Sequence, residues 1–424
     1  MKRVFFSLGA GMVGCAWALQ ASAAAIAKSK ETVILSFDHK DGASPQAGLI
    51  DVKGTLYGTS NWGPNCSLEN EFGCGTVFSV KPTTGAETVL YPFCSQPRCT
   101  DGQFPEGGVI DVNGTLYGTT EFGGAHCTSG TGCGTIFSVN PASGAETVLY
   151  SFCKLDYPNC TDGAIPVAGL IAVDGTLYGT TAIGGANGSG TLFAFNPKTG
   201  AETVLYSFCA QQNCSDGSEP FAGLIDLKGT LYGTTQLGGA DGDGTIFAFD
   251  MTTASETVLH SFSGGTDGAQ PYTASLIDVQ GTLYGTTLSG GGGDCKGEPG
   301  GCGTVFSLDI ATGTESVLYA FCRHSIRHQC RDGDSPVASL INVKGILYGT
   351  TQFGGTYTNE LPGNGVVFAV DPTTRTETVL DAFQSRKKNG ANPCSDLIDV
   401  TGLLYGTTAS GGAHADGTVF ALRP

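Results

Sequence analysis

The sequence predicts an all-β fold, a seven-bladed β-propeller with four antiparallel strands in each blade. Three observations support this prediction: a peptide that recurs seven times, four strand-like segments in each repeat, and chain ends that complement one another. The peptide is Leu-Tyr-Gly-Thr-Thr or Leu-Tyr-Gly-Thr-Ser, and its copies stand 52 to 64 residues apart, with tyrosines at Tyr57, Tyr117, Tyr178, Tyr232, Tyr284, Tyr348 and Tyr405. Repetition at a period of roughly 50 residues is typical of propellers and solenoids.

Each repeat is predicted to contain four short strands, named A to D in chain order. In the second repeat they fall at residues 107–112, 115–120, 134–139 and 145–152, which are rich in β-branched and aromatic residues. Strands A and B are joined by pairs such as Asn113-Gly114, whose glycine supplies the positive φ that a two-residue hairpin needs. A Pro-containing turn joins strands C and D. Each repeat is therefore expected to be an antiparallel meander.

The two ends of the chain predict a closed ring. Residues 31–37 match strand D, whereas the chain stops shortly after a strand C at residues 417–422. Seven copies of every strand are present only if the N-terminal strand 31–37 completes the last blade. Closure of this kind removes the exposed edges that an open array presents. We therefore expect residues 31–424 to form a single propeller domain.

The repeat has features of known families. Its pattern, x-G-T-L-Y-G-T-T-x-x-G-G followed by G-T-V-F and E-T-V-L, resembles a kelch blade, although Val-Leu-Tyr stands where the kelch tryptophan is expected. The same peptides more closely resemble the GloVer-type secreted bacterial tandem-repeat family, over nearly all of residues 31–422. This resemblance implies a secreted propeller without an assigned biochemical role, often with a separate anchor.

The N-terminus is predicted to be an export signal. Residues 1–23 combine a charged start, an apolar stretch and an Ala-x-Ala cleavage site, so residues 24–30 become a linker. The mature chain is then expected to be secreted or periplasmic. No other apolar run approaches the ~18 residues that span a bilayer, which predicts no transmembrane segment in the mature chain. The alternative is a lipobox that ends at Cys15, which would be acylated and anchor the protein to a membrane.

The charge balance argues against some partners. The formal net charge is −17, and it becomes −19 when Lys2 and Arg3 leave with the signal peptide. Such an excess of carboxylates argues against nucleic acid as a partner. We expect a monomer, unless Cys394 bridges two chains.

Cysteines occur mostly as close sequential pairs. Of the sixteen, Cys15 lies in the signal peptide and Cys394 is left over. In an exported protein, local disulfides are the expected state of the rest. The predicted pairs are Cys66 with Cys74, Cys94 with Cys99, Cys127 with Cys133, Cys153 with Cys160, Cys209 with Cys214, Cys295 with Cys302, and Cys322 with Cys330. All seven lie in B–C or D–A loops.

These loops share one face of the predicted disc, because successive strands alternate in direction. That face, with its disulfide-stapled loops, is the expected binding surface. The residue after each D–A proline enters strand A near the mouth of the central channel, and it differs from blade to blade. We name these residues the collar: Gln46, Glu106, Val167, Phe221, Tyr272, Val337 and Cys394. They are predicted either to face a ligand or to be unconstrained.

Two neighbouring D–A loops also carry a basic patch, suited to an acidic glycan or protein partner. Its candidate binding residues are Arg323, Arg327, Arg331, Arg386, Lys387 and Lys388. His324 and His328 lie among them, between Cys322 and Cys330. A zinc site is disfavoured there, because sister loops hold two cysteines without such histidines. A solvated loop pair without a partner is the alternative to a binding patch.

A D-G-x-x-P peptide, or a near copy, recurs in every D–A loop. Its acidic residue is Asp41, Asp101, Asp162, Asp216, Asp267 or Asp332, with Asn389 in the last copy. A calcium ring is one interpretation. A turn in which the side chain accepts from nearby backbone N–H groups is favoured, because single carboxylates on separate blades do not converge on one ion. No metal or cofactor is therefore predicted.

The sequence favours a binding or scaffold protein over an enzyme. It contains no recognised catalytic motif, and its histidines fall at unrelated blade positions. The predicted function is recognition of a glycan or protein through the D–A and B–C loop face. The alternative is a glycan-active hydrolase or lyase that uses carboxylates near the channel mouth, with Glu106, Glu219, Asp334 and Glu360 as non-repeated candidates.

Overall fold

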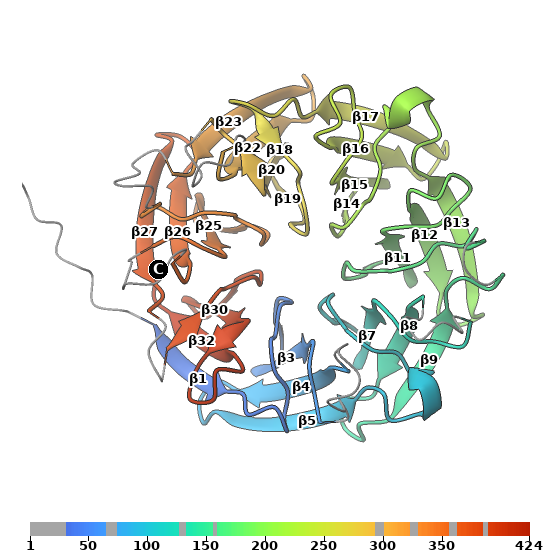
Figure 1. Ribbon diagram of the computed structural model, residues 1–424, viewed down its shortest axis with the longest axis vertical. Helices are drawn as coiled ribbons and strands as arrows, with labels where there is room; N and C mark the ends of the chain where they lie inside the picture. Colours follow the sequence, from blue (N-terminus) through green and yellow to red (C-terminus); the bar gives the residue numbers. More distant parts are fainter. Residues whose placement is uncertain are drawn as a thin grey trace, which may run out of the picture.

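The computed structural model describes residues 31–64, 74–126, 133–155, 159–292, 301–322, 330–355, 363–384 and 389–424. Seven four-stranded antiparallel sheets are arranged as the blades of a ring around a central axis (Figure 1). The predicted seven-bladed propeller is therefore confirmed. Within these ranges no helix is long and apolar enough to cross a membrane.

The first four blades follow one another along the chain, each with its strands in sequence order from the channel outward. Blade 1 comprises β2 (Ile50–Val52), β3 (Thr55–Ser60), β4 (Thr76–Lys81) and β5 (Ala86–Pro92). Blade 2 comprises β6 (Ile110–Val112), β7 (Thr115–Thr120), β8 (Thr135–Val139) and β9 (Glu146–Ser151). Blade 3 comprises β10 (Ile171–Val173), β11 (Thr176–Thr181), β12 (Thr191–Asn196) and β13 (Ala201–Ser207). Blade 4 comprises β14 (Ile225–Leu227), β15 (Thr230–Thr235), β16 (Thr245–Asp250) and β17 (Ser255–Ser261).

The remaining blades keep this arrangement and add short accessory strands. Blade 5 comprises β19 (Ile277–Val279), β20 (Thr282–Thr287), β22 (Thr304–Asp309) and β23 (Thr314–Ala320). Blade 6 comprises β24 (Ile341–Val343), β25 (Ile346–Thr351), β26 (Val366–Asp371) and β27 (Thr376–Ala382). Blade 7 comprises β29 (Ile398–Val400), β30 (Leu403–Thr408), β32 (Thr418–Leu422) and β1 (Thr32–Ser36). Two-residue strands pair beside the blades, β18 (Gly268–Ala269) with β21 (Ser289–Gly290) and β28 (Gly390–Ala391) with β31 (Ser410–Gly411), and 3-10 turns lie at η1 (Pro97–Cys99) and η2 (Gln212–Cys214).

The innermost strands are shorter than predicted. Strand β6 begins at Ile110, whereas the sequence predicted a start at Gly107. The residues before it leave the sheet and approach the next blade so closely that a Cβ on Gly107 would lie 2.8 Å from the Ala168 backbone. This close approach toward the channel axis ends the pairing with strand β7.

The A–B turns form as predicted. Asn113 and Gly114 have φ values of 55° and 83°, the pair of positive angles that a two-residue hairpin needs. Blade 1 has the same turn at Lys53 and Gly54, where the Gly54 N–H also donates to Asp51 Oδ1 at 2.8 Å.

Four residues of the repeated Leu-Tyr-Gly-Thr-Thr peptide make defined structural contacts. In blade 2, Leu116 is fully buried, and a Cβ on Gly118 would lie 2.6 Å from the Phe137 ring. Thr119 Oγ1 donates to the Ala168 carbonyl of blade 3 at 2.9 Å. Thr120 Oγ1 bonds the hydroxyl of Thr135 at 2.8 Å within the blade. The peptide therefore stabilises its own blade and the contact of that blade with the next one.

The core between blades is a ring of phenylalanine pairs. The residue after the outermost strand of each blade packs edge-on against a ring from the next blade, as Phe152 does on Phe193 with centroids 5.2 Å apart. Both side chains are fully buried. The seven pairs are Phe37–Phe78, Phe93–Phe137, Phe152–Phe193, Phe208–Phe247, Phe262–Phe306, Phe321–Phe368 and Phe383–Phe420. Every interface between blades thus has the same aromatic centre.

The ring closes where predicted. Strand β1 pairs antiparallel with β32, placing Thr32 opposite Ala421. The Glu31 N–H donates to Asp381 Oδ2 of blade 6 at 2.7 Å, and Thr407 Oγ1 donates to the Ala47 carbonyl of blade 1 at 3.4 Å. The N-terminal strand thereby completes blade 7 and joins the two ends of the array.

Candidate functional site

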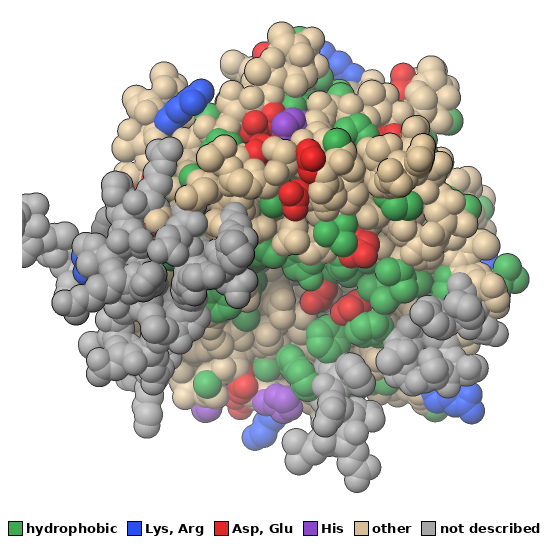
Figure 2. Space-filling view, turned by 45° about the horizontal axis from the view of Figure 1, so that its top comes forward, with side chains coloured by type: hydrophobic (Ala, Val, Ile, Leu, Met, Phe, Trp, Pro, Cys, Tyr) green, Lys and Arg blue, Asp and Glu red, His purple; other side chains and the backbone are tan. Residues whose placement is uncertain are grey.

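A cavity of about 580 Å³ lies at the channel, and all seven collar residues line it. The collar was picked out of the sequence only because it varies between otherwise similar blades. Its placement follows from topology, because each member stands just before an innermost strand. In the view of Figure 2, hydrophobic and acidic side chains lie around the central hollow.

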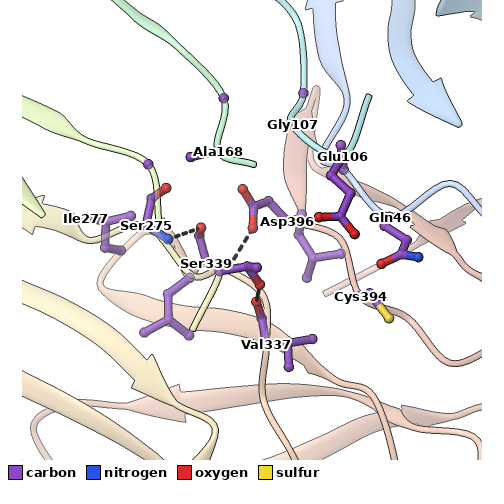
Figure 3. Close-up of a pocket in the computed structure, with 18 of the residues that line it drawn as sticks. Gln46, Glu106, Gly107, Ala168, Ser275, Ile277, Val337, Ser339, Cys394 and Asp396 are labelled. Carbon is purple, nitrogen blue, oxygen red and sulfur yellow. Dashed lines mark hydrogen bonds between the residues drawn. The ribbon is translucent and has the colours of Figure 1, made fainter. Parts of the chain in front are cut away.

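The collar has a polar side and an aromatic side. Gln46, Glu106 and Cys394 lie together on one side of the cavity (Figure 3). On blades 4 and 5, the rings of Phe221 and Tyr272 contact each other with centroids 5.0 Å apart. Both aromatic side chains are half-buried, so part of each remains accessible from the cavity.

A second ring lies deeper along the channel, two residues after the collar residue in six blades and three residues after it in blade 5. Its members are small in most blades, and they are Gly48, Gly108, Gly169, Gly223, Ser275, Ser339 and Asp396. A hydrogen-bond chain crosses three of them, because the Ser275 N–H donates to Ser339 Oγ at 2.8 Å and the Ser339 N–H donates to Asp396 Oδ1 at 2.6 Å (Figure 3). Burial raises the pKa of the Asp396 carboxyl. This aspartate was not singled out from the sequence.

The carboxyl groups at the channel influence one another. Burial raises the pKa of Glu106, and the neighbouring Asn61 amide acts in the opposite direction. Burial also raises the pKa of Glu121 to about 8, with a further contribution from the charge of Glu106. Burial, and then the charges of Glu106, Glu121 and Glu219, raise the pKa of the Tyr272 hydroxyl. The charge of Glu121 therefore interacts with those of the collar residues Glu106 and Tyr272.

Glu121 was not predicted, although the sequence carries a signal for it. The residue that follows the repeated Thr-Thr or Thr-Ser varies from blade to blade, as the collar residue does, although alanine and glutamine each occur twice. These residues are Asn61, Glu121, Ala182, Gln236, Leu288, Gln352 and Ala409. Gln352 of this set lines the cavity. Burial raises the pKa of the Cys394 thiol to about 12, and the hydrogen bond from Gln352 acts in the opposite direction. The rule that found the collar therefore also finds these residues.

The predicted basic patch is mostly outside the described residues. Arg323, Arg327, Arg386, Lys387 and Lys388 all lie there, together with the carboxylate candidate Glu360. Arg331 is described and exposed. The patch stays a prediction.

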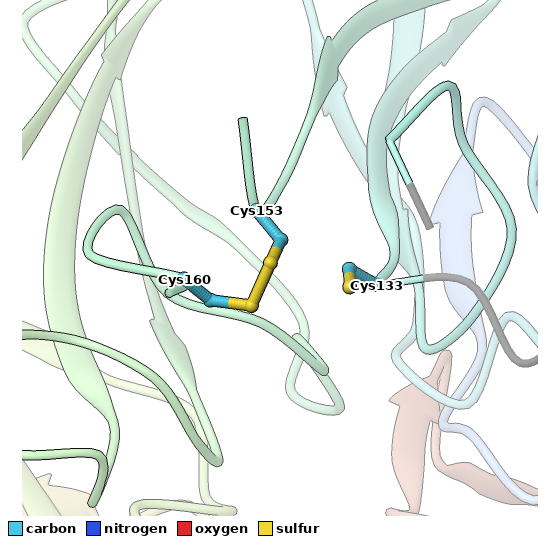
Figure 4. Close-up of side chains that lie close together, drawn as sticks. All are labelled: Cys133, Cys153 and Cys160. Carbon is cyan, nitrogen blue, oxygen red and sulfur yellow. A yellow bond between two sulfur atoms is a disulfide. The ribbon is translucent and has the colours of Figure 1, made fainter. Parts of the chain in front are cut away.

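Four of the predicted disulfides are present: Cys94–Cys99, Cys153–Cys160, Cys209–Cys214 and Cys322–Cys330. Cys133 and Cys302 are also disulfide-bonded, while their predicted partners Cys127 and Cys295, like Cys66, lie outside the described residues. Cys133 lies beside the Cys153–Cys160 disulfide (Figure 4). Disulfides of this number fit an extracytoplasmic location.

The D-G-x-x-P aspartates form the predicted turns. Asp101 Oδ2 accepts from the Ser95 N–H at 2.8 Å, and Asp216 Oδ2 accepts from the Ala210 N–H at 2.8 Å. The same carboxylates also join neighbouring blades, which the sequence did not reveal. Tyr150 illustrates this, because its hydroxyl contacts Asp162 Oδ2 at 2.9 Å and Glu202 Oε2 of the next blade at 3.0 Å.

These inter-blade contacts hold carboxyl groups in a partly buried place. Burial, and then the charge of Asp41, raise the pKa of Glu87 to about 9. Burial raises the pKa of Glu146 and Glu202 to about 7, and that of Glu377 to about 8. The repeated glutamate at the start of strand D is therefore part of the contact between blades.

These pKa shifts predict that stability falls as pH rises. The folded protein binds more protons than the unfolded chain between the ordinary glutamate pKa of 4.5 and the raised values of about 7 to 9. Stability from these groups is fully present below the lower limit and is lost through that window. We expect a higher Tm at roughly pH 5.5 than at roughly pH 8.5. Glu146→Gln, which cannot ionise, should flatten the profile, and a Tm that increases across this range would contradict the assignment.

The chain matches a known family of sequence repeats. The family described as Gloeobacter/Verrucomicrobia repeat matches residues 23–159, 99–298 and 294–424. The chain belongs to this family. The Gloeobacter/Verrucomicrobia repeat spans all seven blades, so the likeness concerns the scaffold as a whole. A search of curated proteins found no match.

Solved structures similar to this Gloeobacter/Verrucomicrobia repeat protein are distant from it in sequence. An oligogalacturonate lyase from Vibrio parahaemolyticus is 9% identical, with a TM-score of 0.51 and 94% of each chain covered. A nidogen/laminin complex has a chain that is 15% identical, with a TM-score of 0.41, 77% of this chain covered and 92% of that one. Identities this low do not transfer an activity to this member of the family.

Proposed function

We propose that the protein is a secreted or periplasmic binding propeller that recognises a neutral glycan at its channel mouth. The observation that carries this proposal is the collar, where an aromatic pair faces a cavity that also contains amide and carboxyl groups. Ligand sites commonly combine an apolar lining with a few polar groups that fix orientation. A cavity of about 580 Å³ is within the usual range for small ligands.

The aromatic pair supplies the apolar part of such a site. The C–H face of a sugar ring packs on an aromatic ring, and its hydroxyls bond polar groups at the rim. Phe221 and Tyr272 offer the rings, while Gln46 and Glu106 offer hydrogen-bonding groups. Both kinds of group lie in the segments that lead directly into the innermost strands, which limits the order that has to be gained on binding.

The charge of the cavity favours a neutral ligand. Among the described residues that line it, none is lysine, arginine or histidine, whereas Glu106, Asp278 and Asp396 are acidic. A uronate or sulfate placed there would face carboxyl groups without a cation. An acidic partner, as the basic loops predict, would therefore have to bind at those loops and not in the cavity.

A double variant tests the proposal. Phe221→Ala with Tyr272→Ala should weaken binding of a neutral oligosaccharide by at least roughly tenfold, because both apolar faces are removed, and tenfold is about 1.4 kcal/mol. Isothermal titration of the purified protein measures this. Leu155→Ala is the matched control, since Leu155 is 64% exposed and does not line the cavity.

The same titration separates the two candidate surfaces. If charge reversal at Arg386, Lys387 and Lys388 abolishes binding while the aromatic double variant leaves it intact, the ligand binds the basic loops and the collar proposal is wrong.

A second candidate function is glycan hydrolysis by the carboxyl groups of Glu106 and Glu121. The favouring observation is the raised pKa of about 8 for Glu121, which keeps it protonated as a general acid near neutral pH, beside Glu106. Chromatographic detection of the products released from a panel of polysaccharides tests this function. Turnover that disappears in Glu121→Gln would establish this function over simple binding.

A further inference from the structure

One inter-blade contact differs from its sisters in a way that points to a metal. In four of the other blades a tyrosine on the outermost strand accompanies the D–A aspartate: Tyr91, Tyr150, Tyr206 and Tyr319. Blade 4 has His260 on β17 in this position, next to Asp267. The imidazole thus replaces a hydroxyl between two carboxylates.

The three side chains converge from neighbouring blades. His260 and Asp267 come from the end of blade 4 and the loop after it, whereas Glu315 stands on β23 of blade 5; β17 and β23 form the outer rim of the two blades (Figure 1). One donor atom from each of the three lies within 4.8 Å of the others. His260 Nε2 and Asp267 Oδ2 are 3.3 Å apart. Two ligands at about 2.1 Å from zinc in tetrahedral geometry are separated by roughly 3.4 Å, so this spacing suits a shared ion.

Two carboxylate oxygens at this site are free to coordinate an ion. Asp267 Oδ1 and Glu315 Oε1 are buried, and neither has a hydrogen-bond partner among the residues that the structure describes. The other oxygen, Asp267 Oδ2, already accepts from the Ser263 N–H at 3.0 Å and its hydroxyl at 3.2 Å, which orients the carboxylate. The His260 ring is held edge-on by Phe262, with centroids 4.9 Å apart. The ligand atoms are therefore positioned before any ion arrives.

We propose that His260, Asp267 and Glu315 bind a zinc ion that links blades 4 and 5. Imidazole nitrogen with carboxylate oxygens is a ligand set that zinc accepts, and three protein ligands leave a fourth position for water. The side chains of His260 and Asp267 are about a fifth exposed, at 21% and 18%, so water and ions reach them. Magnesium prefers six oxygens, which this site does not offer.

Zinc titration of the chelator-treated protein by calorimetry tests the proposal. The wild type should bind one more equivalent of zinc than His260→Tyr, which restores the side chain of the sister sites and should keep the fold. Glu315→Gln should bind that equivalent at least roughly tenfold more weakly, and zinc should raise the Tm of the wild type more than that of either variant. Equal zinc stoichiometry and affinity in wild type and His260→Tyr would overturn the proposal.

Two further readouts keep the result decisive. Cobalt in place of zinc should give visible absorption bands without a strong thiolate charge-transfer band, because no sulfur is among the ligands; such a thiolate band on the same equivalent would assign it to cysteines and overturn the proposal. If His260→Tyr fails to fold by circular dichroism, Glu315→Gln decides, and unchanged zinc affinity in that variant would contradict the site. Magnesium at the same concentration serves as the control ion and should produce no heat of binding.

Discussion

Removal of residues 24–37 is expected to open the ring and to destabilise the whole propeller. The deletion removes β1, the Glu31 contact to blade 6 and the Phe37 ring that packs on Phe78 at 5.1 Å. Loss of a buried phenylalanine side chain alone costs about 3–5 kcal/mol. The unpaired edge of β32 would then be free to pair with other chains.

Size-exclusion chromatography and thermal unfolding measure this result. We expect oligomers or aggregates and a strongly lowered Tm. A deletion of residues 24–30 is the matched control, because it removes the predicted linker and retains Glu31 and β1. A deletion of residues 24–37 that stays monodisperse with the wild-type Tm would show that the exchange of strands between the chain ends is not needed for closure.

Phe152→Ala is expected to cost about 3–5 kcal/mol of stability, the largest effect we expect from a single substitution. The fully buried ring lies at the interface of blades 2 and 3 and packs edge-on against Phe193. The pair itself should contribute about 0.5–1.5 kcal/mol beyond the buried area.

Urea unfolding of Phe152→Ala, Phe193→Ala and the double variant measures both quantities. The coupling energy of the cycle isolates the contact between the rings. Thr147→Ala is the control, because Thr147 lies on the same strand β9 and is exposed. A Phe152→Ala variant as stable as this control would contradict the aromatic ring as the centre of the blade interfaces.

Repetition made the scaffold predictable from the sequence. The seven copies of Tyr57 and its equivalents located strand B, and the surplus segment at 31–37 predicted the closure that β1 and β32 make. The collar was predictable for the opposite reason. Gln46, Glu106 and Phe221 differ where the rest of the blade is constant, and topology brings such positions to one mouth.

Contacts between distant segments were not predictable in this way. Tyr150, Asp162 and Glu202 are all repeated residues, and nothing in a single repeat shows that they meet across two blades. The depth of Asp396 in the channel depends on how closely seven strands approach the axis, which only the folded ring determines. The predicted start of strand A at Gly107 was wrong for the same reason.

The most direct test of the proposed glycan site is a panel of neutral and acidic oligosaccharides, titrated into the purified protein with binding and cleavage measured together. We expect saturable binding of a neutral oligosaccharide at one site per chain, without cleavage, and weakened by loss of Phe221 and Tyr272. Binding of acidic sugars alone, or no binding by any member of the panel, would contradict it.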